Sequence, residues 1–324
     1  MRYKGQIRRA AWLAHFVVQL LTISRDISET MCPYLGMAHV ANAIPENAAG
    51  EFFVDRSCID CDLCRQLAPE VFARSDHAEQ SFVKCQPARG DDHRALMALV
   101  TCPTSSIGTR TKQDVRAAAR AFPEPISDDI LFCGYASKAA YGAASYLIRR
   151  PEGNVLVDSP RFAKALVDRI AELGGVRYLV LTHQDDVADH AKFHERFGCE
   201  RVIHRADVQD TTQDCERIID GDIDLADDLR LIHVPGHTRG SIVLLHREVL
   251  FTGDHLWGTL DQTSLRASQK MCWYSWSEQL KSIAKLAELH FTQLLPGHGR
   301  RFAVSNAAAM SAAIRAFVAS FVFG

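Results

Sequence analysis

The chain has 324 residues, of which 47% are hydrophobic and 23% charged, and its formal net charge is −2 at pH 7. This length allows two domains, and the near-neutral balance gives no electrostatic reason to expect nucleic acid or an anionic membrane as a partner. No apolar run beyond residue 50 approaches the roughly 20 residues needed to cross a bilayer. Ten cysteines are too sparse for a disulfide scaffold, which favours a reducing compartment.

Residues 1–49 form an N-terminal extension outside the expected domains. Basic residues precede an apolar stretch from Ala10 to Leu21, but no A-x-A cleavage pattern follows promptly. An export signal, an organellar targeting segment and a disordered extension remain the alternatives, and Met31 or Met37 could serve as a later start. We expect a cytoplasmic protein, or one of an organelle such as a plastid if the extension is a targeting segment.

The remaining chain divides into a turn-rich segment over residues 50–112, a linker over 113–129 with a short helix and prolines, and a domain over 130–324. In this last domain strands and helices alternate. Strands are expected at 155–157, 178–181, 229–234, 242–245, 249–251 and 293–295, and helices at 160–173, 188–197, 277–289 and 305–321.

The turn-rich segment contains four cysteines in a spacing typical of iron–sulfur proteins. The run CIDCDLC places Cys58, Cys61 and Cys64 three residues apart, and Cys102 stands directly before Pro103. Three thiolates on a tight loop can converge on one cluster, and a distant Cys-Pro supplies the fourth ligand. Over residues 50–110 the segment resembles the single-cluster bacterial ferredoxins, which implies an α+β ferredoxin-like domain with one 4Fe–4S cluster.

Four segments of the second domain end an apolar strand with His or Asp. In α/β architectures, sites collect beyond the carboxyl ends of strands. Four such segments predict one shared metal site: LVLTHQDDVADH (179–190), LIHVPGHTRGS (231–241), VLFTGDHLW (249–257) and LLPGHGRRF (294–302).

These segments resemble the metallo-β-lactamase superfamily over roughly residues 130–305. The family pattern is H-x-H-x-D-H, then a His in a PGHT-like turn, an Asp in a GD turn and a late His; His237, Asp254 and His298 match the last three. The resemblance implies an αββα sandwich with two metal ions, bridged by Asp254. It also implies that His237 completes the first metal site and His298 the second.

The first motif departs from the family pattern. After His183, Asp185 stands at the position of the second His in the family pattern. Asp189 and His190 follow two residues later than the Asp-His pair of that pattern. We predict His183 and Asp185 on one metal and Asp189 and His190 on the other, with Asp186 as an alternative to Asp185.

This departure favours iron, with zinc or manganese as alternatives, because carboxylate oxygen is a harder ligand than imidazole. An acidic residue at this position also resembles the flavodiiron branch of the superfamily, which implies redox chemistry at a di-iron centre.

Three further features surround the predicted site. Asp158, at the end of a strand, could orient a ligating His. His255 adjoins the bridging Asp254, and we expect both to be catalytic, although a packing role for His255 is the alternative. The aromatic run MCWYSWSEQL (271–280) could form a substrate wall, or belong to the core or a domain interface.

The leading function is that of an oxidoreductase, in which the ferredoxin-like domain exchanges electrons with a di-iron site acting on a small molecule. A reductase or another ferredoxin would be the electron donor. A metal-dependent hydrolase of esters, thioesters or amides is the alternative, with the cluster structural or regulatory. A non-enzymatic electron carrier or sensor is the third possibility. The oligomeric state stays open.

Overall fold

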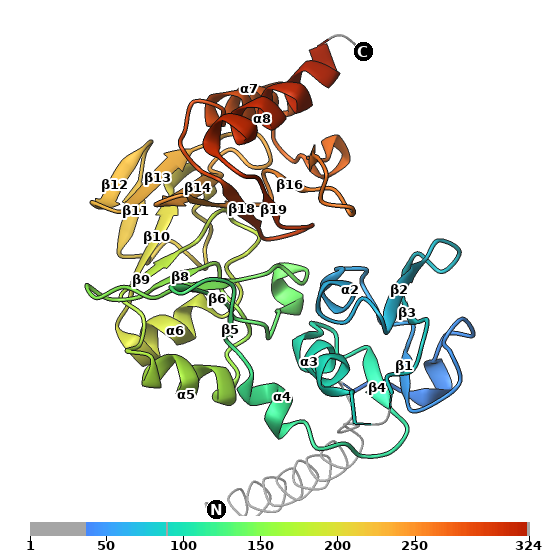
Figure 1. Cartoon of the computed structure of the whole chain (residues 1–324). Coiled ribbons are helices and arrows are strands. Elements are labelled where there is room, and N and C mark those ends of the chain that lie inside the picture. Colours follow the sequence, from blue (N-terminus) through green and yellow to red (C-terminus); the bar gives the residue numbers. More distant parts are fainter. Residues whose placement is uncertain (1–36, 89, 323–324) are drawn as a thin grey trace, which may run out of the picture. The chain divides into compact units, whose positions relative to one another are not determined.

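The computed structural model of the protein describes residues 37–88 and 90–322 (Figure 1). The chain divides into two units, residues 1–37 and 38–324, and the description below concerns the second unit. Most of the expected N-terminal extension therefore lies outside the described residues.

The cysteine-rich segment folds into two small two-stranded sheets and two helices. Strand β1 (Phe52–Val54) pairs antiparallel with β4 (Ile107–Thr109), and β2 (Phe72–Ser75) pairs with β3 (Gln80–Val83). Helices α2 (Leu63–Leu67) and α3 (His93–Thr101) lie between these strands along the chain and bury apolar side chains. The fold is the expected small α+β, ferredoxin-like domain.

Residues before position 50 also contact this domain, beginning with the short helix η1 (Val40–Asn42). The side chain of Asn47 donates to the carbonyls of Ile44 and Val54 and accepts from the amides of Val54 and Val83. One amide side chain thus ties the residues near position 44 to two strands of the domain.

A short helix and a strand connect the two domains. Helix α4 (Arg116–Arg120) is followed by β5 (Glu124–Pro125), which pairs antiparallel with β6 (Ile130–Phe132). Part of the expected linker is therefore the edge strand of the next sheet.

The rest of the chain forms two mixed sheets. The first has the order β11-β10-β9-β8-β7-β6-β5 and is parallel from β8 to β11. Its further strands are β7 (Tyr146–Ile148), β8 (Val155–Val157), β9 (Tyr178–Val180), β10 (Glu200–His204) and β11 (Arg217–Ile219).

The second sheet has the order β12-β13-β14-β15-β18-β19, and only β15 and β18 pair in parallel. Its strands are β12 (Ile223–Ala226), β13 (Leu229–His233), β14 (Ile242–His246), β15 (Val249–Gly253), β18 (Gln293–Pro296) and β19 (Phe302–Ala303). A small separate hairpin joins β16 (Trp257–Gly258) to β17 (Leu265–Arg266).

Side chains on the two faces of the second sheet belong to two different hydrophobic cores. Leu231 and Leu244 belong to the core that contains the first sheet, whereas their neighbours Ile232 and Val243 pack with Ile283 and other residues of the outer helices. Because successive side chains of a strand point to opposite faces, an apolar strand can fill two layers at once.

Helices α5 (Lys164–Glu172) and α6 (His190–Phe197) accompany the first sheet, and α7 (Trp276–Leu286) and α8 (Ala307–Val322) the second, on its outer face (Figure 1). This is the expected αββα sandwich. Each of the four helices predicted for this domain starts within four residues of its expected position. Helix α5 begins late, at Lys164, because the segment from Pro160 runs extended or irregular. Among the described residues, no helix has the length and apolarity to cross a membrane.

Candidate metal centres

The four predicted cluster cysteines line one cavity in the ferredoxin-like domain. Cys58, Cys61, Cys64 and Cys102 share it with apolar side chains such as Val54 and Ile107. Burial, and to a lesser degree the neighbouring thiols, raises the pKa of Cys64 to about 12. Four thiols converging on an apolar cavity fit a 4Fe–4S cluster, because cluster binding replaces their protons and offsets the unfavourable ionisation.

Hydroxyl and amide groups surround the same sulfurs. The Ser106 amide donates to Cys102 Sγ at 3.3 Å, and Cys64 Sγ lies 3.2 Å from the Ser81 hydroxyl. Hydrogen bonds to cluster sulfurs tune the reduction potential of such centres. Cys85, which the sequence pattern excluded from the ligands, is exposed and does not line the cavity.

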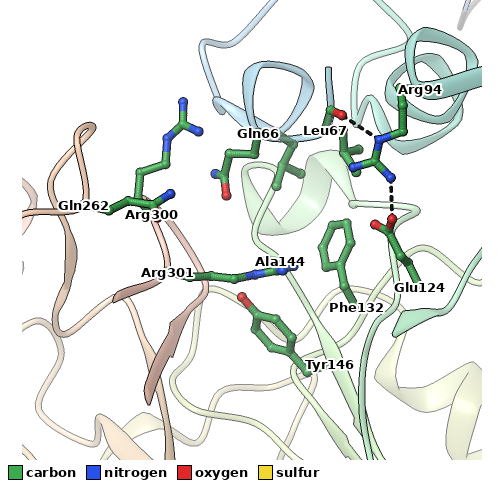
Figure 2. Close-up of a pocket in the computed structure, with 11 residues that line it drawn as sticks. Gln66, Leu67, Arg94, Glu124, Phe132, Ala144, Tyr146, Gln262, Arg300 and Arg301 are labelled. Atoms are coloured by element: carbon green, nitrogen blue, oxygen red, sulfur yellow. Dashed lines mark hydrogen bonds and ion pairs between the residues drawn. The ribbon is translucent and has the colours of Figure 1, made fainter. Parts of the chain in front are cut away.

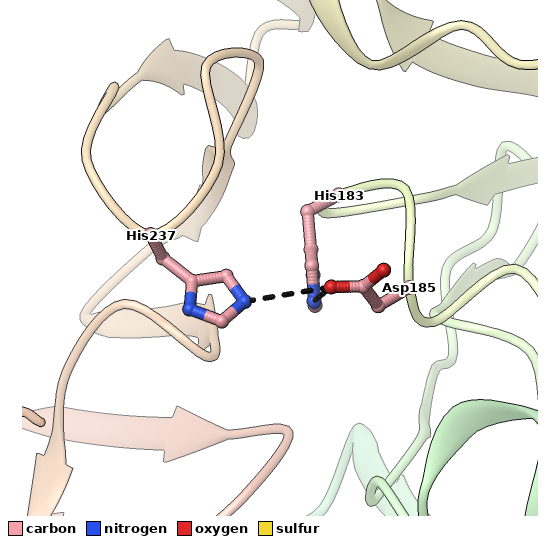
Figure 3. A group of neighbouring side chains, drawn as sticks. All are labelled: His183, Asp185 and His237. Atoms are coloured by element: carbon pink, nitrogen blue, oxygen red, sulfur yellow. Dashed lines mark ion pairs between the residues drawn. The ribbon is translucent and has the colours of Figure 1, made fainter. Parts of the chain in front are cut away.

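In the sandwich domain, His183, Asp185 and His237 come together from two loops (Figure 3). Asp185 Oδ2 lies 3.9 Å from Nε2 of His183 and 3.9 Å from Nε2 of His237. Asp254 Oδ2 lies 3.8 and 3.9 Å from the same two nitrogens. The structure therefore brings the side chains predicted for the first metal, and the predicted bridging carboxylate, to one point.

The two imidazole nitrogens at this point, Nε2 of His183 and of His237, are buried and have no hydrogen-bond partner among the described residues. Buried polar atoms without partners are rare and call for a ligand. Two nitrogens and two carboxylates that face one another at this spacing fit a divalent cation.

Asp186 forms a second group with His183 and Asp254. Both of its carboxylate oxygens are buried without a hydrogen-bond partner among the described residues. A Cβ built on Gly297 would lie 2.9 Å from Asp186 Oδ2 and from Asp254 Oδ1, so glycine leaves this space to the two carboxylates. Burial, then the charges of Asp254 and Asp158, raises the pKa of Asp186 far above its ordinary range. A second cation here would relieve that repulsion.

The motif therefore supplies both aspartates, Asp185 to the first group and Asp186 to the second. The sequence treated them as alternatives for one position.

Hydrogen bonds determine which nitrogen of His183 is free. The Thr182 hydroxyl donates to Asp158 Oδ2 at 3.1 Å, and it lies 3.0 Å from His183 Nδ1. Since its one proton points to Asp158, Nδ1–H of His183 must be the donor in the second contact, which leaves Nε2 as a lone-pair donor facing the site. Asp158 thus orients a candidate ligand through Thr182, in the supporting position that the sequence suggested.

His298 lies against Asp254, with Nδ1 2.8 Å from Oδ1 and 2.9 Å from Oδ2. Its Nε2 lies 3.2 Å from the carbonyl oxygen of Tyr141. Burial would lower the pKa of His298, but the facing Asp254 outweighs it and raises the pKa to about 9. His298 is therefore at the site, paired with the predicted bridging carboxylate.

The structure does not bring Asp189 and His190 to this cluster. Asp189 accepts from the Phe162 amide at 2.8 Å and pairs with Lys192 at 2.7 Å. His190 Nδ1 lies 3.4 Å from the guanidinium of Arg201. Because α6 begins at His190, the helix carries this side chain toward β10, and Asp186 occupies the place expected for the pair.

His255 and Trp273 complete the surroundings. His255 is 1% exposed, and neither ring nitrogen has a partner among the described residues. Burial, then His237 and His183, lowers its pKa to about 3, so the ring is neutral. Its catalytic role stays a prediction. Trp273 is 58% exposed, with its ring centre 6.4 Å from that of His237, so it borders the site and is not part of the core.

Sequence reasoning missed Asp207, which fastens the two ligand-bearing loops to each other. Its carboxylate accepts from the Gln184 amide at 3.1 Å, from the Thr238 hydroxyl and from the Gly240 amide at 2.6 Å. Asp207 could have been found from its position just after strand β10, because functional sites lie beyond the carboxyl ends of parallel strands.

The fold and the paired centres define a ferredoxin-type iron–sulfur domain followed by a metallo-β-lactamase fold. Residues 54–109 match the family described as 4Fe-4S single cluster domain of Ferredoxin I, and residues 131–303 match the Metallo-beta-lactamase superfamily. The chain belongs to the metallo-β-lactamase superfamily. No curated protein matches it.

Solved structures resemble part of the chain at low identity. The metallo-beta-lactamase from Pontibacter korlensis is 17% identical, with a TM-score of 0.45 over 59% of this chain and 97% of that one. FIM-1 from Pseudomonas aeruginosa in the mono-zinc form is 16% identical, with a TM-score of 0.43 over 56% of this chain and 85% of that one. TTHA1623 in a di-iron-bound form is 21% identical, with a TM-score of 0.42 over 50% of this chain and 89% of that one.

Proposed function

We propose that the protein is an oxidoreductase in which the ferredoxin-like domain passes electrons to a dinuclear metal site that reduces or activates a small molecule. Cys58, Cys61, Cys64 and Cys102 would hold a 4Fe–4S cluster, which supplies single electrons, and the site around Asp254 would hold two metal ions, iron in preference to zinc or manganese. A reductase or another ferredoxin would donate the electrons, and a small-molecule oxidant would accept them.

A short chain of contacts between a cluster cysteine and the metal-site residues carries this proposal. Gly142 lies directly against Cys61, because a Cβ built on it would meet Cys61 Cβ at 2.6 Å and Sγ at 3.2 Å. The preceding residue, Tyr141, accepts a hydrogen bond from Nε2 of His298, and Nδ1 of His298 faces Asp254. A cluster cysteine and a metal-site histidine are thus joined through two consecutive residues.

The donor set supports iron over zinc. Three carboxylates lie at the site, those of Asp185, Asp186 and Asp254. The imidazoles are those of His183 and His237, and His298 would be a third. Hard anionic oxygen ligands suit iron or manganese and stabilise the oxidised state. A redox-inert metal would leave the adjacent cluster without an electron acceptor.

Hydrolysis is the second candidate, and the His183–Asp185–His237 group favours it. Two imidazoles and a carboxylate form a donor set that catalytic zinc also uses, with the open position taken by water.

Gly142→Ala tests the connection. The added Cβ cannot fit against Cys61, and alanine is strained at a φ of +87°. Gly90→Ala is a matched control, since Gly90 has a φ of +88° and open space around it. After photoreduction of the cluster, we expect slower reoxidation through the metal site in Gly142→Ala and native rates in Gly90→Ala. Equal rates in both variants, at full cluster and metal content, would contradict the proposal.

A further inference from the structure

A second cavity, of about 140 Å³, lies between helix α2 and the loop that follows His298 (Figure 2). Three arginines, Arg94, Arg300 and Arg301, line it together with one carboxylate, Glu124. A concave surface with more positive than negative charge concentrates anions.

Two of these arginines already have carboxylate partners. Arg94 pairs with Glu124, and its Nε donates to the Leu67 carbonyl at 2.8 Å. Arg300 Nε lies 2.7 Å from Asp62 Oδ2. Among residues 37–88 and 90–322, no carboxylate pairs with Arg301. Of the three arginines that line the cavity, Arg301 is therefore the one whose positive charge is not balanced by a carboxylate.

The guanidinium of Arg301 is held in place by aromatic rings. It lies 5.2 Å from the ring centre of Phe132 and 5.8 Å from that of Tyr146, and Figure 2 shows the side chain extending beside these residues. Tyr146 is itself fixed, because its hydroxyl donates to the Pro296 carbonyl at 2.7 Å. Arg301 also interacts with the Tyr146 hydroxyl, and its other N–H groups are available for an oxyanion.

The size of the cavity limits the ligand. Pockets for cofactor-sized ligands have about 300–1,000 Å³. The 140 Å³ found here suits a few water molecules or one small anion. We propose that this cavity is a binding site for a small oxyanion, a carboxylate or a phosphate, with Arg301 as its main contact.

Residues that line the cavity are directly connected to residues of both metal centres. Leu63, in its lining, precedes the cluster ligand Cys64, and Gln66 donates to the Gly299 carbonyl at 3.1 Å, next to His298. Negative charge bound here opposes the arrival of an electron at the nearby cluster. Occupation of the cavity therefore lowers the reduction potential of the cluster.

Calorimetric titration of the cluster-loaded full chain with phosphate, and separately with acetate, at constant ionic strength tests the site. We expect saturable binding of at least one of them, weakened about tenfold or more in Arg301→Gln. Arg230→Gln, which removes an exposed arginine elsewhere, should bind like the native chain. The bound anion should also lower the midpoint potential of the cluster in the native chain but not in Arg301→Gln.

Tighter binding of phosphate would indicate that the natural ligand is a tetrahedral oxyanion. Tighter binding of acetate would indicate a planar carboxylate. Absence of saturable binding of both anions, or equal binding by Arg301→Gln with its cluster absorption intact, would overturn the proposal.

Discussion

The carboxylate of Asp207 accepts a hydrogen bond from the hydroxyl of Thr238, the residue that follows the candidate ligand His237. The same carboxylate accepts from the amide of Gln184, the residue that follows His183. Asp207 is 1% exposed, so these bonds form in a protected environment. One buried side chain therefore sets the spacing of the two histidines that face the first metal position.

Asp207→Asn should weaken metal binding without removing a ligand. The amide NH₂ group cannot accept the hydrogen bonds that the carboxylate oxygen accepted, so one of the two loops loses its anchor. Supporting residues of this kind contribute about 10- to 100-fold to metal affinity. Competition with a chelator measures that loss, and exposed Asp210→Asn is the control with native affinity expected. Native metal affinity in Asp207→Asn would contradict the proposed role of Asp207 in positioning the two histidines.

Cys102→Ser should abolish stable cluster binding. The Ser106 amide donates to Cys102 Sγ, and a serine oxygen replaces a soft thiolate with a harder and less acidic ligand. Anaerobically purified native protein should contain about four iron and four sulfide in this domain, with visible absorption that the variant lacks. Exposed Cys85→Ser should keep the full spectrum. A Cys102→Ser variant with native absorption would refute the ligand assignment.

Asp254→Ala should release both metals, whereas Asp186→Ala should release one. Asp254 faces His183, His237 and His298, but Asp186 belongs only to the second group. Removing a shared ligand destabilises both positions, and we expect at least about 100-fold weaker binding at each. Metal content after stepwise chelation separates the cases. Two tightly held metals in Asp254→Ala would exclude a bridging role.

Glu216→Gln should lower the unfolding free energy by about 1–2 kcal/mol at pH 7. Arg201 is buried, and its Nη2 donates to Glu216 Oε1 at 2.7 Å. Burial would raise the pKa of Glu216, but the hydrogen bonds from Arg201 outweigh it and lower the pKa from 4.5 to about 2.

Because the folded pKa is depressed, the stabilisation is complete above about pH 4.5 and disappears as the pH falls through about 2. The difference between native and variant protein in denaturant titrations should shrink over that window. Glu172→Gln, in an exposed pair, should change stability by less than about 0.5 kcal/mol. A Glu216→Gln effect independent of pH would contradict the pairing.

Local patterns predicted much of this molecule. The cysteine spacing identified all four cysteines that line the cluster cavity. Apolar runs predicted strands such as β8 and β9, because buried strands read as continuous hydrophobic stretches. Edge strands such as β5 and β19, of two residues each, escaped prediction because so short a segment has no period.

The candidate ligand set was harder to predict, since it depends on where helix α6 begins. Spacing placed Asp189 and His190 at the site, but the helix start directs His190 toward Arg201. Asp207 and Gly142 depend on contacts between segments distant in sequence, which no local pattern encodes.

Reductive titration of the native protein, purified anaerobically without added metals and analysed for metal content, tests the redox proposal most directly. With two ferric ions beside the cluster, the protein should contain about two non-cluster iron ions and accept about three electrons per chain. The reduced protein should then be reoxidised by a small oxidant such as oxygen. Uptake of one electron, two zinc ions per chain and ester or amide hydrolysis unaffected by cluster reduction would contradict the account and establish the hydrolase.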